Sequence, residues 1–145
     1  MIIRRINSTR ESRMMRVAAY ARVSTIKEEQ EKSFETQLRY YTELIQRNAR
    51  WTFVEVYADQ GRSGTSVSGR PAFQRMMKDA RERKLDIILV KSISRFSRNV
   101  ADAQKYVYEL KDLGVEVRFE REAISSFDPS AEMIFNILSA VAQEE

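Results

Sequence analysis

Apolar positions in this chain fall into short runs that alternate between strand-like and helix-like patterns. VAAYARV at residues 17–23 is a run of Val, Ala and Tyr that predicts a buried strand, and WTFVEVYAD at 51–59 alternates as a second strand would. DIILVKS at 86–92 is nearly continuous in apolar residues, which is typical of a strand covered on both faces. VEVRFE at 115–120 predicts a further strand.

Helical spacing occurs between these strands. Phe34, Leu38, Tyr41 and Ile45 recur at intervals of three or four residues, which predicts a helix that Ser33 can cap.

Two further helices are predicted, one beginning at Pro71 and one from about Asn99 to Leu113, with Gly114 as its stop. Strands that alternate with helices predict an α/β fold with a mainly parallel central sheet flanked by helices. Ligands of such sheets bind outside the carboxyl ends of the strands.

The last segment, residues 129–145, has nine apolar residues among seventeen, spread around a predicted helix. A helix that is apolar on several faces is buried or packs against a partner chain. The segment ends without a glycine or asparagine cap, so we expect this helix to be cut short and the natural protein to continue.

Composition narrows the function classes. The length of 145 residues fits one domain, there is no apolar run long enough to span a membrane, and the chain has neither cysteine nor histidine. A disulfide framework and a structural zinc site are therefore excluded, and we expect no cofactor and no metal.

Charge is concentrated at the N-terminus. Residues 1–16 carry five arginines against Glu11, which accounts for the whole net charge of +4, so the remainder is balanced. This basic extension is either a solvated tail or an arm that touches an anionic partner.

Candidate chemistry gathers at one edge of the predicted sheet. Ser24 directly follows the first strand, and Arg22 lies two residues earlier on the same side of an extended chain. Arg70 closes a glycine-rich stretch predicted as a mobile loop, and Arg95 and Arg98 follow the buried strand at a spacing that predicts one shared helical face. Guanidinium groups bind phosphate oxygens bidentately, and one arginine can contribute about 10³- to 10⁵-fold to phosphoryl transfer.

Each of these signals has a plainer interpretation. Ser24 can be a helix cap, Arg22 can be an ordinary surface residue, and the two later arginines can pair with Asp102 or Glu109. Their coincidence at one edge favours phosphoryl transfer.

Several motifs resemble the catalytic domain of the serine recombinases, the family of resolvases, invertases and large serine integrases. They are, in the family's order, YARVST, TQ, YADQGRSGTSVSGRPAF, LDIILVKSISRFSRN and ILSAVAQEE. The resemblance extends over about residues 16–145.

The resemblance implies site-specific DNA strand cleavage, exchange and religation. Ser24 would attack a DNA phosphate and form a covalent 5′-phosphoserine link. Arg22, Arg70, Arg95 and Arg98 match the family's catalytic arginines. Gln37 and Asp59 match supporting polar positions, and Tyr20 is expected to pack and not to react. An arginine cluster also explains how a serine can be activated without histidine, because it stabilises the ionised nucleophile.

The resemblance also implies domain organisation and partners. We expect a basic extension at 1–16, an α/β catalytic domain at 17–128 and the start of a long oligomerisation helix at 129–145, followed by a DNA-binding region absent from this chain. The implied partners are double-stranded DNA recombination sites and further copies of the chain, as a homodimer and a synaptic homotetramer. The implied setting is the cytoplasm, with a bacterial or phage gene.

One position departs from the family pattern. Resolvases have an aspartate before the central arginine, in a D-R-L-G-R pattern, where this chain has Ser94 in SRFSR. The SRFSR motif and the N-terminal extension together favour the large serine recombinases. The alternatives are a small resolvase or invertase and, in another class, a non-catalytic phosphate-binding or assembly module.

Overall fold

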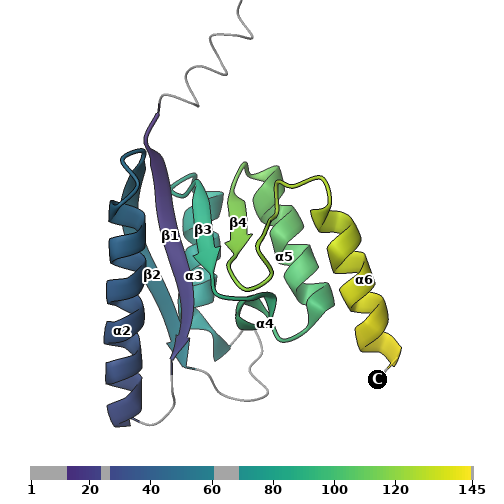
Figure 1. Ribbon diagram of the computed structural model, residues 1–145, viewed down its shortest axis with the longest axis horizontal. Helices are drawn as coiled ribbons and strands as arrows, with labels where there is room; N and C mark the ends of the chain where they lie inside the picture. The colour runs from purple at the N-terminus through teal and green to yellow at the C-terminus, as the bar shows by residue number, and fades with distance from the viewer. Residues whose placement is uncertain (1–12, 24–26, 61–68, 145) are drawn as a thin grey trace, which may run out of the picture.

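The computed structural model describes residues 13–23, 27–60 and 69–144, and its helices and strands mostly alternate along the chain (Figure 1). In order they are β1 (Met15–Val23), α2 (Lys27–Gln46), β2 (Trp51–Gln60), α3 (Pro71–Arg81), β3 (Ile87–Val90), α4 (Ile93–Phe96), α5 (Val100–Asp112), β4 (Glu116–Phe119), β5 (Ile124–Ser125) and α6 (Ala131–Glu144). The fold is α/β, as the sequence predicts.

The five strands form one sheet in the order β2-β1-β3-β4-β5. β1 to β4 are parallel, and β5 pairs antiparallel with β4 as a short edge strand. Because the strands are parallel, the carboxyl ends of β1 and β3 lie at the same edge, with Tyr20 beside Val90. Residues that follow these two strands are therefore brought together.

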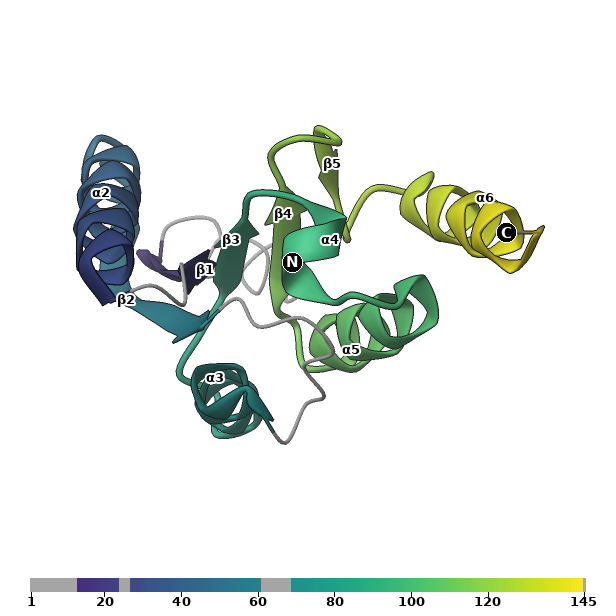
Figure 2. The same cartoon turned by 90° about the horizontal axis from the view of Figure 1, so that it is seen from below.

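Helices cover both faces of the sheet (Figure 2). Val17, Ala19 and Ala21 of β1 pack with Tyr41 and Ile45 of α2 on one face. The alternate residues of the same strand belong to the opposite face, where α3 and α5 supply most of the covering side chains. This two-sided burial explains why β1 and β3 are continuous apolar runs.

Two predicted boundaries differ from the structure. β1 begins at Met15, so Arg16 is inside the strand that we expected to start at Val17. α2 begins at Lys27, so Ser33 lies within the helix and is not its cap. The segment KEEQEK at 27–32 consists of good helix formers without apolar periodicity, and the pattern of buried positions therefore missed it.

α6 buries only one side. Ala131 and Phe135 are buried against the domain, whereas Met133, Ile137 and Val141 are 60%, 55% and 52% exposed. These three residues are four apart and form one apolar stripe along the helix. Apolar residues lie on more than one side of α6, as the sequence predicts, and within the described residues the side with this stripe stays exposed to solvent.

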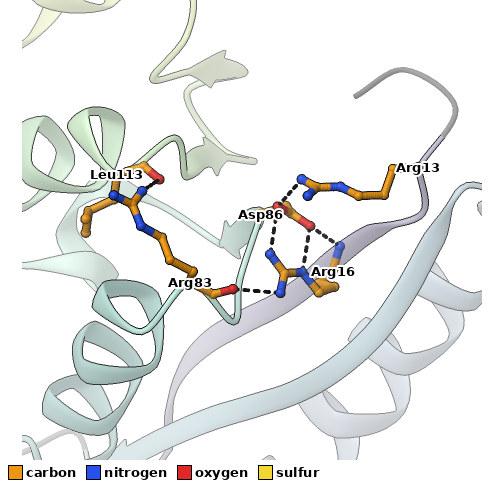
Figure 3. A network of polar contacts seen from close by, with 5 residues as sticks. All are labelled: Arg13, Arg16, Arg83, Asp86 and Leu113. Carbon is orange, nitrogen blue, oxygen red and sulfur yellow. Dashed lines mark hydrogen bonds and ion pairs between the residues drawn. The ribbon is translucent and has the colours of Figure 1, made fainter. Parts of the chain in front are cut away.

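At the amino ends of the strands, Asp86 collects several hydrogen bonds (Figure 3). Its carboxylate accepts from the backbone N–H of Arg16 at 2.7 Å and from the guanidinium groups of Arg16 and Arg13 at 3.0 and 2.9 Å. Arg16 also donates to the carbonyl of Arg83 at 2.6 Å. Two arginines counted in the predicted basic extension are therefore paired with the domain, at the edge opposite the predicted site.

The pKa of Asp86 lies below its ordinary value of 3.8. Burial opposes ionisation, but the hydrogen bonds and positive charges of Arg16, with the charge of Arg13, outweigh it. A carboxyl group with a lowered folded-state pKa stabilises the fold above its ordinary pKa and loses that contribution as the pH falls through the folded-state value.

We therefore predict that Asp86→Asn lowers the free energy of unfolding by about 1–3 kcal/mol at pH 7, because a buried charged acceptor is lost. The difference from the wild type should shrink as the pH drops below 3.8. Urea denaturation followed by circular dichroism at several pH values measures this. Asp112→Asn, an exposed carboxylate on α5, is the control. An equal effect at every pH would contradict the assignment.

Candidate functional site

A cavity of about 550 Å³ opens at the carboxyl edge of the sheet, between α2 and the segment that leads from β3 into α4. Its lining residues are Tyr20, Ala21, Arg22, Val23, Lys32, Ser33, Thr36, Gln37, Lys91 and Arg95. Four of these side chains are cationic and none is a carboxylate. Among the described residues, the cavity wall is thus suited to an anion.

The predicted nucleophile, Ser24, lies outside the described residues. Its neighbour in the chain, Val23, is the last residue of β1 and lines the cavity.

Arg22 is half-buried in the cavity wall. Burial lowers the pKa of its guanidinium, Tyr20 opposes this change, and the positive charges of three other arginines lower the pKa further. Those three are Arg70, Arg95 and Arg98. Since arginine stays protonated at every pH near neutrality, Arg22 keeps its charge. The other three arginines predicted from the sequence are therefore close enough to Arg22 to act on its charge.

Gln37 fixes the strand end that carries Arg22. Its side-chain amide donates to the backbone carbonyl of Arg22 at 3.1 Å and to the hydroxyl of Ser33 at 3.2 Å. The amide thereby ties α2 to the end of β1.

Asp59 is buried beside the cavity and is the acceptor for two elements. Its carboxylate accepts from the Tyr20 hydroxyl at 2.8 Å and from the backbone N–H groups of Ala72 and Phe73, both at 2.9 Å. These amides belong to the first turn of α3, whose N-terminal N–H groups have no partner within the helix. Asp59 therefore caps α3 from β2 and orients Tyr20.

Arg70 differs from the other three arginines because it is only 6% exposed. It donates to the hydroxyl of Tyr20 at 3.1 Å and to the carbonyl of Phe96, and its guanidinium lies 3.9 Å from the ring centroid of Phe73. Tyr20 packs and is 1% exposed, in line with the sequence expectation. Arg70 thus stands behind the cavity wall.

Arg95 and Arg98 do not share a helical face as predicted. Arg95 is on α4, whose N-terminus is capped by the Ser92 hydroxyl, but the helix ends at Phe96 and Ser97 is extended. The chain bends before α5, so Arg98 lies outside any helix. Both arginines are exposed, and Glu109, one suggested partner, pairs with Arg81 instead.

Sequence reasoning missed Lys32 and Lys91 as cavity residues. Lys91 directly follows the buried strand β3, so it could have been predicted to lie at the carboxyl edge of the sheet with the arginines. Lys32 belongs to a polar stripe on α2 with Ser33, Thr36 and Gln37, which becomes recognisable only once the helix is known to begin at Lys27.

Comparisons with known proteins agree on one family. A family model described as the N-terminal domain of resolvase matches residues 17–145. A resolvase/recombinase of Pseudomonas putida and the transposon Tn3 resolvase of Escherichia coli are both 34% identical to the chain, over 131 and 132 residues. The match covers 90% of this chain but 65% and 64% of those proteins, so the chain spans less than two thirds of either relative.

A solved structure gives the same result. The crystal structure of the N-terminal catalytic domain of TP901-1 integrase aligns with a TM-score of 0.64 and 30% sequence identity, covering 88% of this chain and 94% of that one. Within the described residues, no helix is both long and apolar enough to cross a membrane.

The Asp59 network generates a stability prediction. Asp59→Ala should lower the free energy of unfolding by about 2–4 kcal/mol, because two buried backbone N–H groups and the Tyr20 hydroxyl lose their hydrogen-bond acceptor. Tyr20→Phe, which removes one hydroxyl only, should cost about 1 kcal/mol. Urea denaturation measures both variants. A loss below about 0.5 kcal/mol for Asp59→Ala would contradict its capping role.

Proposed function

This chain belongs to the resolvase N-terminal domain family, and we propose that it is the catalytic part of a serine recombinase that performs site-specific DNA recombination. The observation that carries the proposal is the cationic cavity at the end of β1, the strand that directly precedes Ser24 in the chain. Arg22 in its wall lies close enough to three other arginines for their charges to act on it. Such a site fits a phosphodiester, which is anionic and gains charge as it reacts.

The proposed reaction is a transesterification. The Ser24 Oγ attacks the phosphorus of a DNA phosphodiester, loses its proton and forms a 5′-phosphoserine ester, while the bond to the 3′ oxygen breaks and that oxygen leaves as a hydroxyl. The ester keeps the energy of the broken bond, so the reverse attack by a 3′ hydroxyl reseals DNA without a nucleotide.

The arginines have different proposed roles. Arg22, Arg95 and Arg98 contact the phosphate and neutralise the charge of its transition state. Arg70 contributes its charge from behind the cavity wall and holds the hydroxyl of Tyr20. Gln37 and Asp59 keep β1 and α3 in place.

Two types of recombinase are compatible with this site. We propose the large serine recombinase or integrase type, because Ser94 replaces the aspartate of the resolvase pattern and a basic extension precedes the domain. The small resolvase is the second candidate, since the two relatives described above carry resolvase names. The length and domain content of the complete open reading frame separate them.

The proposed partners are double-stranded DNA recombination sites and further copies of this chain. The stripe formed by Met133, Ile137 and Val141 is the proposed contact between copies, within a homodimer and a synaptic homotetramer. Burying such a stripe removes apolar surface from water in each copy. A non-catalytic phosphate-binding module remains the alternative of another class.

We predict that Ser24→Ala in the full-length protein abolishes the covalent protein–DNA adduct but leaves binding of the recombination site within about twofold, because phosphate contacts and not the nucleophile supply affinity. Denaturing electrophoresis of labelled DNA detects the adduct, and a mobility shift measures binding. Ser130→Ala, an exposed serine before α6, is the control. An adduct formed by Ser24→Ala would refute the assignment, and a wild type without any adduct would favour the non-catalytic module.

We also predict that Ile137→Lys weakens self-association of the full-length protein by at least about tenfold, since a charge would be buried in an apolar contact. Lys111→Glu on α5 is the control for changed charge. Analytical ultracentrifugation measures the dissociation constant. A wild type that stays monomeric at concentrations well above micromolar would contradict an interface on α6.

A further inference from the structure

The turn between β4 and β5, residues 120–123, connects the two walls of the cavity. The backbone N–H of Glu120 donates to the carbonyl of Val90 at 3.0 Å, and that of Arg121 donates to the carbonyl of Lys91 at 2.8 Å. The turn is therefore fixed to the end of β3, at the point where the chain leaves the sheet toward α4. Figure 2 shows α4 beside this end of β4.

Glu122 reaches α4 from this turn. Its carboxylate accepts from the backbone N–H of Ile93, the first residue of α4, at 3.2 Å. The next residue, Ala123, has a φ of +55°, a left-handed conformation that costs an alanine about 1 kcal/mol. A left-handed residue reverses the chain tightly. In this turn, the Glu122 carboxylate lies within hydrogen-bonding distance of the first residue of α4.

Glu120 reaches α2 from the other end of the same turn. Its carboxylate accepts from the hydroxyl of Tyr41 at 2.9 Å and from that of Tyr40. Burial raises the pKa of Tyr41, and the charge of Glu120 raises it further, so the hydroxyl keeps its proton and donates. Tyr41 lies one helical turn beyond Gln37, the residue that ties α2 to β1.

We infer that Glu120 and Glu122 are positioning residues that set the two walls of the cavity, Glu120 through α2 and Glu122 through α4 and Arg95. The inference rests on the proposed function. α4 has only four residues and few internal hydrogen bonds, so it depends on outside partners to hold Arg95 in place. A displacement of about 1 Å at a reacting group can reduce a rate by about 100-fold.

The position of Ser94 gives a second argument for Glu122. Ser94 stands where the resolvase pattern has an aspartate, and its hydroxyl contacts the hydroxyl of Ser92 at 3.1 Å. The carboxylate found at this segment comes instead from Glu122, which contacts the adjacent residue Ile93. A side chain of the turn after β4 thus supplies a carboxylate to the start of α4.

The test compares Glu122→Ala with Glu122→Gln in the full-length protein, acting on a duplex that contains its recombination site. Glu122→Ala should slow formation of the covalent adduct by about tenfold or more in single turnover, with the affinity for DNA unchanged within about twofold. Glu122→Gln keeps an acceptor oxygen for Ile93 and should stay within about threefold of the wild type. If the alanine variant does not fold, Glu122→Ser, which is too short to reach Ile93, replaces it.

A coupling measurement separates positioning from a general loss of stability. If Glu122 acts through Arg95, then Glu122→Ala should add less than about twofold to the slow residual rate of Arg95→Ala. Independent effects would multiply, and that result would overturn the role of Glu122.

Hydrogen exchange tests whether Glu120 and Glu122 hold α2 and α4 in place, without a measurement of enzyme activity. The amides of residues 93–96 should exchange at least about tenfold faster in Glu122→Ala than in the wild type, and the amides of α2 around Tyr41 should do so in Glu120→Ala. Asp112→Asn should change neither region. Unchanged exchange in either glutamate variant would overturn the corresponding half of the inference. If the wild type forms no adduct, the proposed function fails, but the exchange result still decides whether the turn holds α2 and α4 in place.

Discussion

The positive charge gathered at the end of β1 is the constraint on which the structure of the site depends. Arg22 carries a lowered pKa because it is buried near three other arginines, and Lys32 and Lys91 add to the positive charge of the same cavity wall. Such a group of cations is unfavourable until an anion binds, so the fold has to hold it in place from outside.

The supports of the cationic cavity come from several elements. Asp59 at the end of β2 caps α3 and holds Tyr20, which in turn accepts from Arg70. Gln37 binds the end of β1. The turn after β4 contacts α2 and the start of α4. Each support is a buried or half-buried polar contact between different helices, strands or turns, and the cavity therefore exists only in the folded domain.

Much of this arrangement could be predicted from local patterns. The apolar runs of β1 and β3 indicate strands covered on both faces, and parallel strands must bring the residues after them to one edge. The convergence of Arg22, Arg95 and Arg98 follows from that rule. The errors arose where the local pattern carries no signal. α2 begins in charged residues, and the extended residue Ser97 ends α4 before Arg98.

The sequence by itself determined which strands are covered on both faces, the edge at which the cations gather, and the family. These depend on residue type and on spacing along the chain. Tertiary structure alone decided that Arg70 is enclosed, that Arg13 and Arg16 are held by Asp86, and that glutamates of one turn reach two helices. The physical reason is that hydrogen bonds between segments about 80 residues apart, such as Tyr41 with Glu120, leave no periodic signal in the chain. Only the packed backbone brings their donors and acceptors within reach.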